Sequence, residues 1–172
     1  MREMGMVRRQ AHGHALPGMR PDSMYRIERT QGVDGSWGGR MAYRFEFDPV
    51  NRILLVRIEG PLTEELATEL YGAIRKYAVA TDARAGIWDF SSVTEVALSA
   101  EFIRYLASQE PAMPDATRHP RFMVAPTAVA FGLSRMFQIL GGATRPLLKV
   151  VHSVDQALVE LGVQSPQFKS LE

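Results

Sequence analysis

Asp89, His119 and His152 are the side chains of this sequence best suited to acid–base chemistry. A carboxylate beside an imidazole can orient the ring and transfer a proton near neutral pH. Nothing in the spacing of these three residues forces them together. A small hydrolase or transferase centred on Asp89 and His119 is therefore the weakest of three hypotheses, and we expect a protein that is not an enzyme.

Two further catalytic signatures fail because of their context. A nucleophile elbow needs Gly-x-Ser-x-Gly at a strand-to-helix turn, whereas Ser134 lies inside an expected helix, where we predict a solvent-facing serine. A phosphate-binding loop needs glycines between a strand and a helix. Gly141 and Gly142 instead follow a helix, and this position predicts a left-handed C-terminal cap.

Metal and cofactor sites are not expected. The chain has no cysteine, which excludes thiolate ligands and fits a reducing compartment. His12 and His14 form a His-x-His pair, but no further ligand follows at metal-binding spacing. Arg118, His119 and Arg121 form a short basic patch, which we interpret as a solvated strand entrance rather than an anion site.

Composition excludes several classes of protein. Of the 172 residues, 46% are hydrophobic and 23% are charged, as in ordinary globular domains. The 20 basic and 19 acidic side chains give a net charge of +1, too small to attract nucleic acid or anionic lipid. The basic N-terminus lacks the apolar run of a signal peptide, and polar residues interrupt the most apolar stretch, residues 122–140. We therefore expect a cytoplasmic protein with no transmembrane segment.

The chain divides into three parts. Residues 1–40 hold half of the 14 glycines and no sustained hydrophobic period, which predicts a flexible N-terminal tail. Met24 and Met41 offer alternative starts, so this tail need not always be translated. Residues 41–163 carry the regular pattern of one domain, and residues 164–172 are predicted to form a C-terminal tail.

Strands and helices alternate through residues 41–163. Residues 43–47 and 52–58 alternate in polarity around a turn-prone segment, which predicts a hairpin that ends at Gly60 and Pro61. Three further strands are predicted at residues 85–90, 121–125 and 147–151, and four helices begin after Thr63, Ser99, Thr127 and Ser153. This order predicts the α/β class: a single mixed sheet with an antiparallel N-terminal hairpin, parallel later strands and about four helices.

The helix predicted after Thr127 is the most informative element. At about 100° per residue, Ser134, Arg135 and Gln138 form a polar stripe that should face solvent. The residues expected to point the other way are Val129, Leu133, Met136, Phe137, Ile139 and Leu140. Phe131 lies in the middle of the polar stripe, so either Tyr105 or the proline-rich loop of residues 111–120 covers its ring, or a partner does.

Five short motifs follow one another in this domain. They are Thr63-Glu64-Glu65, residues 87–94 (Ile-Trp-Asp-Phe-Ser-Ser-Val-Thr), residues 124–127 (Val-Ala-Pro-Thr), residues 131–137 (Phe-Gly-Leu-Ser-Arg-Met-Phe) and residues 153–158 (Ser-Val-Asp-Gln-Ala-Leu). In this order they resemble the SpoIIAA-like family, which is related to the STAS domains of anti-sigma factor antagonists and includes bacterial STAS/SEC14-like proteins. The resemblance implies a small mixed sheet with helices, no catalytic machinery, and a regulatory role through binding to other proteins or, as in SEC14-like relatives, to apolar ligands.

One motif departs from that family. In its phosphoregulated members an Asp-Ser-Ser-Gly run opens the second helix, and the first serine accepts the phosphate. Here Leu98 stands at the acceptor position, which puts a phosphoswitch in doubt. Ser99 is predicted to cap the helix, and a phosphate on it would meet both the helix N-terminus and Glu101.

Two functions from different classes follow. The first is a non-enzymatic STAS-like interaction module that binds a protein partner, or associates with itself, through the third helix. Its predicted contact residues are Phe131, Arg135 and Gln138, with Thr94, Glu95 and Ser99 from the loop before the second helix. The alternative is a SEC14-like binding protein for an apolar small molecule or lipid, with a cavity that Met113, Phe122 and Met123 line and the proline-rich loop gates.

Overall fold

The computed structural model describes residues 43–171, so the predicted flexible tail at residues 1–40 lies outside the described residues. Within this part, six strands form one sheet in the order β5-β4-β3-β2-β1-β6. The strands are β1 (Tyr43–Asp48), β2 (Ile53–Thr63), β3 (Ala85–Ala97), β4 (Arg121–Val124), β5 (Leu148–Val151) and β6 (Lys169–Leu171). Strands β2 to β5 run parallel to one another, and β1 is antiparallel to β2 and to β6. The predicted α/β class and mixed sheet are confirmed.

Four helices connect these strands within the described residues. They are α1 (Glu64–Thr81), α2 (Ala100–Ser108), α3 (Ala128–Leu140) and α4 (Val154–Glu160). Thr63, Ser99, Thr127 and Ser153 cap them, and each hydroxyl accepts a hydrogen bond from the backbone N–H three residues further on. All four helix starts are thus confirmed, because capping depends on a residue and its immediate neighbours.

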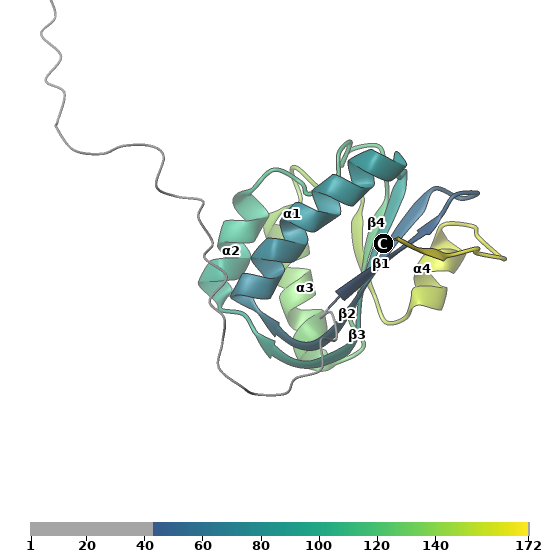
Figure 1. Ribbon diagram of the computed structural model, residues 1–172. Helices are drawn as coiled ribbons and strands as arrows, with labels where there is room; N and C mark the ends of the chain where they lie inside the picture. Colours follow the sequence, from purple (N-terminus) through teal and green to yellow (C-terminus); the bar gives the residue numbers. More distant parts are fainter. Residues whose placement is uncertain (1–42, 172) are drawn as a thin grey trace, which may run out of the picture. The chain divides into compact units, whose positions relative to one another are not determined.

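The helices cover the two faces of the sheet unequally. Figure 1 shows α1, α2 and α3 together on one face, the inner face, and α4 on the opposite, outer face. Alternate residues of β2 point to opposite faces of the sheet. Leu54 and Val56 pack under α1 to α3, whereas Ile53 and Leu55 pack towards α4. Since β5 and β6 lie at opposite edges, the chain between them crosses the outer face, and α4 lies in that crossing.

Strands β2 and β3 are longer than predicted. Strand β2 does not end at Gly60 and Pro61 but continues to Thr63, and β3 continues past Phe90 to Ala97. The two strands pair over this extension through irregular register steps, one of them at Gly60, whose φ of 78° favours glycine. The pairing of β4 with β3 stops at Asp89, so no strand among residues 43–171 lies beside that edge of the β3 extension. The extension carries polar residues, which is why the apolar pattern of the sequence does not reveal it.

The C-terminal residues return to the sheet. Residues 169–171, which the sequence places in a C-terminal tail, form β6 and pair with Phe45 to Phe47 of β1. The backbone N–H of Gln167 donates to Asp48 Oδ2 at 2.9 Å, and Phe168 packs against the outer apolar cluster. These contacts lie far apart in sequence, which is why the local pattern does not reveal them.

The prediction of a left-handed cap at Gly141 and Gly142 is wrong. Gly141 has φ −90° and ψ 4°, and its carbonyl accepts from the N–H groups of Thr144 and Arg145. A Cβ built on Gly141 would lie 2.9 Å from Arg145 Nη1. Glycine at this position therefore leaves space for the arginine side chain.

Candidate functional site

The orientation of α3 differs from the predicted one. Ser134 is buried rather than solvent-facing, and its inward neighbours are Ala130 and Phe137. Ala130 and Ser134 lie one turn apart, and their small side chains let the helix approach the extended ends of β2 and β3. Conversely, Val129 and Ile139, predicted to point inward, are 62% and 70% exposed, and Leu140 is exposed as well.

Phe131 is half-buried, and its cover is neither Tyr105 nor the proline-rich loop. Its ring stacks on His152, which follows β5, with centroids 4.7 Å apart and planes 9° apart. The sequence gives no signal for this contact, because it depends on how β5 lies beside α3. Phe131 is thus part of the contact between α3 and the β5–α4 connection and presents only part of its ring to solvent.

Arg135 and Gln138 differ in exposure. Gln138 is half-buried, donates through Nε2 to the carbonyl of Leu148 on edge strand β5, and accepts from Arg135. Arg135 is exposed and is the one charged residue of α3. The outer face of α3, defined here as Val129, Gly132, Arg135, Ile139 and Leu140, is therefore apolar with a single positive charge.

Thr94, Glu95 and Ser99 are all exposed, but Thr94 and Glu95 lie in strand β3 rather than in a loop. They occupy the carboxyl end of the parallel strands, the end of the sheet at which α3 begins (Figure 1). The Ser99 hydroxyl accepts from Phe102 N–H and donates to Glu64 Oε1 at 2.7 Å. A phosphate on Ser99 would break that hydrogen bond and meet the Glu64 carboxylate, which weakens the case for a phosphoswitch.

The predicted acid–base residues do not form one cleft. Asp89 lies where the pairing of β3 with β4 ends, beside Val124, whereas His119 precedes the other end of β4. His152 stacks on Phe131. Burial lowers the pKa of His119, and the positive charges of Arg121, Arg84 and Arg118 add to this effect against the opposing charge of Asp115. The proposed hydrolase or transferase centre is therefore wrong.

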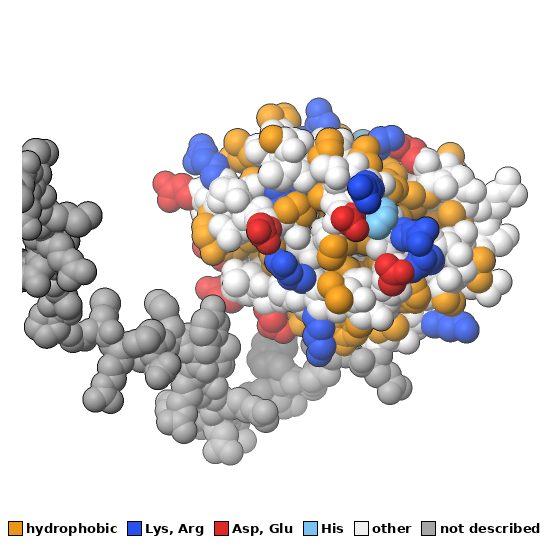
Figure 2. Space-filling model, turned by 90° about the horizontal axis from the view of Figure 1, so that it is seen from above, with side chains coloured by type: hydrophobic (Ala, Val, Ile, Leu, Met, Phe, Trp, Pro, Cys, Tyr) orange, Lys and Arg blue, Asp and Glu red, His pale blue; other side chains and the backbone are white. Residues whose placement is uncertain are grey.

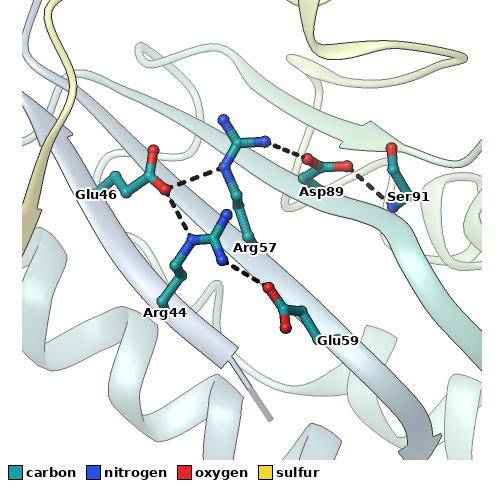
Figure 3. Close-up of polar contacts among 6 residues, drawn as sticks. All are labelled: Arg44, Glu46, Arg57, Glu59, Asp89 and Ser91. Carbon is teal, nitrogen blue, oxygen red and sulfur yellow. Dashed lines mark hydrogen bonds and ion pairs between the residues drawn. The ribbon is translucent and has the colours of Figure 1, made fainter. Parts of the chain in front are cut away.

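The Asp89 carboxylate belongs to a network of ion pairs on the outer face of the sheet (Figure 3). It accepts from Arg57 Nη1 at 2.8 Å and from Ser91 N–H at 2.9 Å. Arg57 also donates to Glu46 at 3.1 Å, and Arg44 bridges Glu46 and Glu59 at 3.0 and 2.6 Å. The residues of this network come from the three adjacent strands β1, β2 and β3. Each of its two arginines has two carboxylate partners.

An apolar cavity of about 100 Å³ lies between the sheet and helices α1, α2 and α3. Met113 and Met123 line it as predicted, but Phe122 does not, because residue 122 points to the outer cluster. Ala112 and Met113 of the proline-rich loop are buried in its wall. The loop is thus part of the core in this conformation.

Two buried arginines, Arg121 and Arg145, line the same cavity and are 1% and 4% exposed. The interpretation of Arg121 as a solvated residue at a strand entrance is wrong, because the proline-rich loop folds over its side chain. Burial, and then repulsion from Arg145, lower the pKa of Arg121 to about 10. The sequence does not point to Arg145 either, since arginines in loops are usually solvated.

Surface charge and metal ligands give no further site in the described residues. On the face shown in Figure 2, basic and acidic side chains lie among apolar ones. Between Tyr43 and Leu171 no three His, Asp or Glu side chains gather as metal ligands do, and His12 and His14 lie outside the described residues. No helix in this range has the length and apolarity needed to cross a membrane.

The sequence matches no protein-family model and no curated protein. Among solved structures, the chain is similar to the anti-sigma factor antagonist SpoIIAA in its unphosphorylated form, with 11% identity and a TM-score of 0.47 over 69% of this chain and 96% of that one. The Bacillus cell fate determinant SpoIIAA in its phosphorylated form matches with 15% identity and a TM-score of 0.45 over 70% and 99%. An uncharacterised DUF3478 protein from Shewanella loihica with a SpoIIAA-like fold matches with 15% identity and a TM-score of 0.38 over 63% and 83%.

Proposed function

We propose that this protein is a non-enzymatic interaction module that binds a protein partner through the outer face of α3. The observation that supports the proposal is the exposure of Val129 and Ile139 on a helix whose other side is packed. A continuous apolar helix face on a small domain is typical of a surface that another protein covers. The proposal keeps Arg135 from the predicted contact residues and moves the centre of the surface from Phe131 to Ile139.

The charge on this face indicates the chemistry of the partner. Arg135 is the one charged side chain of α3, and apolar residues surround it along the helix. A partner that presents an apolar surface with one carboxylate opposite Arg135 would match both features. Gly132 adds to the fit, because a Cβ at this position would meet nothing within 4 Å and the bare backbone leaves room for a partner side chain.

The other predicted contact residues lie at the border of this surface. Phe131 and Gln138 are half-buried beside it, where they bind His152 and Leu148. Thr94, Glu95 and Ser99 are exposed at the sheet end where α3 begins. We assign them to the polar rim, where contacts contribute specificity more than affinity.

The test uses two matched substitutions in the full chain, Ile139→Glu on α3 and Val159→Glu on α4. Both replace an exposed branched residue of a helix, at 70% and 76% exposure, so both should fold normally. Each variant and the unmodified chain would capture proteins from a lysate of cells that naturally make it, and a captured protein would then be purified and titrated. We expect Ile139→Glu to raise the Kd about tenfold or more and Val159→Glu to leave it unchanged.

A charge reversal tests the predicted carboxylate. Arg135→Glu should raise the Kd and reverse its dependence on salt concentration, because the attractive charge pair becomes a repulsion between two carboxylates that added salt screens. Equal binding by all variants would contradict the proposal. A dimer of the unmodified chain in sedimentation that Ile139→Glu disperses would also contradict it, since the face would then be a contact between two copies.

A further inference from the structure

The cavity under α1, α2 and α3 combines apolar walls with buried positive charge. Its walls include Leu70, Trp88, Leu106, Met123 and Phe137, and Arg121 and Arg145 complete them. A smaller cavity of about 40 Å³ under α3 shares Leu62, Phe90, Leu98 and Met123 with it. The apolar space therefore extends from the two arginines towards the inner side of α3.

Backbone carbonyls satisfy most donors of the two guanidinium groups. Arg121 donates to His119 and Met113 at 2.6 and 2.8 Å, and also to Pro114. Arg145 donates to Ala107 and Gln109 at 2.9 and 2.7 Å, to the hydroxyl groups of Tyr71 and Thr144, and to Leu106 at 3.4 Å. All of these acceptors are neutral groups. The two guanidinium groups are therefore hydrogen-bonded, but no negative charge among these acceptors neutralises them.

No carboxylate forms an ion pair with either arginine between Tyr43 and Leu171. The two cations lie close enough to repel each other, and Asp115 acts on Arg121 only from the exposed loop. Arg121 Nε is fully buried and has no hydrogen-bond acceptor among the described residues. A buried cation with an unused donor is energetically costly unless an anion or acceptor meets it.

A surface groove gives a route to this site. The groove lies between α1 and α2 and is lined by Gly72, Arg75, Tyr105 and Glu110 among others. Tyr71 and Leu106 line both the groove and the cavity, so these two side chains lie between them. The Tyr71 hydroxyl accepts from Arg145 Nη2 and donates to the Glu110 carbonyl, and these two hydrogen bonds hold the ring in place. A ligand that enters from the groove would have to break them and displace the ring, which would open the cavity beside the buried charge.

The geometry points to a binding site for a small carboxylate with a compact apolar body, whose carboxylate meets Arg121 and is attracted by the charge of Arg145, and whose body fills the apolar cavity. The charge class follows from two cations that have no counter-ion among residues 43–171, and from the Nε donor of Arg121 that has no acceptor there. The size follows from the volumes of the two adjoining cavities, about 100 and 40 Å³, because a cavity of roughly 150 Å³ holds benzene. A body of about four to six carbons therefore suits it. This site is separate from the outer face of α3 and does not depend on the proposed function.

The first experiment compares two probes of equal length and different charge, hexanoate and n-hexanol, on the unmodified full chain. Titration followed by calorimetry and by methyl chemical shifts of Met113 and Met123 reports affinity and place of binding. We expect hexanoate to bind about tenfold or more tightly than n-hexanol, because a charge-assisted hydrogen bond is added to the same apolar contact. Affinity equal for the two probes, or no binding of hexanoate at millimolar concentration, would overturn the proposal.

Two variants locate the binding. Arg121→Met keeps the unbranched stem and removes the charge and the Nε donor, so it should abolish the preference for hexanoate. Ala112→Leu keeps both arginines and fills the cavity, so it should abolish the binding of both probes while raising or preserving the melting temperature. Arg104→Met replaces an exposed arginine of α2 that lines neither the groove nor the cavity; it is the matched control and should bind as the unmodified chain does.

Each outcome bears on the proposal independently of how Arg121→Met folds. Hexanoate binding that survives Ala112→Leu would place the ligand outside the cavity and contradict the proposal. Methyl shifts at Met113 and Met123 that appear with hexanoate and vanish in Ala112→Leu would support it. Since Ile139→Glu leaves the cavity untouched, loss of partner binding in that variant with normal hexanoate binding separates the two sites.

Discussion

The two faces of the sheet hold arginines in opposite ways. On the outer face, Arg57 lies between Glu46 and Asp89, and Arg44 lies between Glu46 and Glu59, so both arginine charges are neutralised (Figure 3). On the inner face, Arg121 and Arg145 are more deeply buried, yet every acceptor that meets them is a carbonyl or hydroxyl. Each arginine of the outer network thus has two carboxylate partners, whereas the inner pair has no carboxylate partner among residues 43–171.

This difference indicates two roles for arginines. The outer arginines stabilise the sheet, whereas the inner arginines can also bind a ligand. Ion pairs between side chains of adjacent strands stabilise the pairing of those strands and need no further group. Guanidinium groups bound to neutral carbonyls and hydroxyls hold loops in place, but their positive charge is not neutralised and still attracts an anion. The outer face is therefore expected to respond to substitution through stability alone, and the inner face through both stability and binding.

The largest effect is expected from Arg145→Met. The substitution removes the hydrogen bonds to Ala107, Gln109 and Tyr71 and leaves buried carbonyls without donors, so we expect a loss of about 3 kcal/mol in the free energy of unfolding. Urea unfolding of the full chain measures it. Arg75→Met, which breaks an exposed contact of 3.5 Å with Glu110, should change stability by less than about 0.5 kcal/mol. An Arg145→Met protein as stable as the unmodified chain would show that the buried charge costs as much as its hydrogen bonds contribute.

A smaller effect is expected from Asp89→Asn on the outer face. Asp89 is buried, but Arg57 is partly exposed and keeps Glu46, so the loss should be about 2 kcal/mol rather than the roughly 3 to 5 of a fully buried pair. Glu59→Gln is the control, because its partner Arg44 is half exposed, and it should cost less than about 1 kcal/mol. Equal costs for the two substitutions would remove the distinction between the buried and exposed parts of the network.

The smallest effect concerns Asp48, which lies at the end of β1 and on the same face as the network. Burial alone would raise its pKa, but hydrogen bonds from Asn51, Gln167 and Val50 outweigh burial and hold the pKa below its ordinary range. The folded state thus favours the carboxylate, so the contribution of Asp48 to stability is fully present above the unfolded pKa of about 3.9 and is lost as the pH falls through the lower folded value.

Asp48→Asn tests this linkage. We expect it to destabilise the protein by about 1 kcal/mol at neutral pH and to narrow the difference from the unmodified chain in acid. Chemical unfolding at a series of pH values from neutral to strongly acidic measures both. A difference that stays constant down to the lowest pH would show that the charge of Asp48 is not what stabilises the turn and the return of the C-terminal residues to β1.

Much of the fold could be predicted because it depends on neighbours in sequence. The four capping residues, the alternating hairpin strands and the buried runs of β3 and β4 are local patterns, and the structure confirms each. The mixed sheet follows from their order, since crossovers through helices make neighbouring strands parallel. The positions of Met113 and Met123 in the cavity wall could also be predicted, because both are apolar residues of the loop and the strand next to the helices.

The sequence by itself thus determined the elements and their order, and the tertiary structure decided which surfaces are buried. The exposed face of α3 was misassigned because small Ala130 and Ser134, rather than larger apolar residues, turn towards the sheet to allow close packing. The two buried arginines were not predictable, because the acceptors of Arg145 lie up to 74 residues away in the chain. Burial of a charge depends on groups that only the folded chain brings together, whereas a cap or a strand period is set within a few residues.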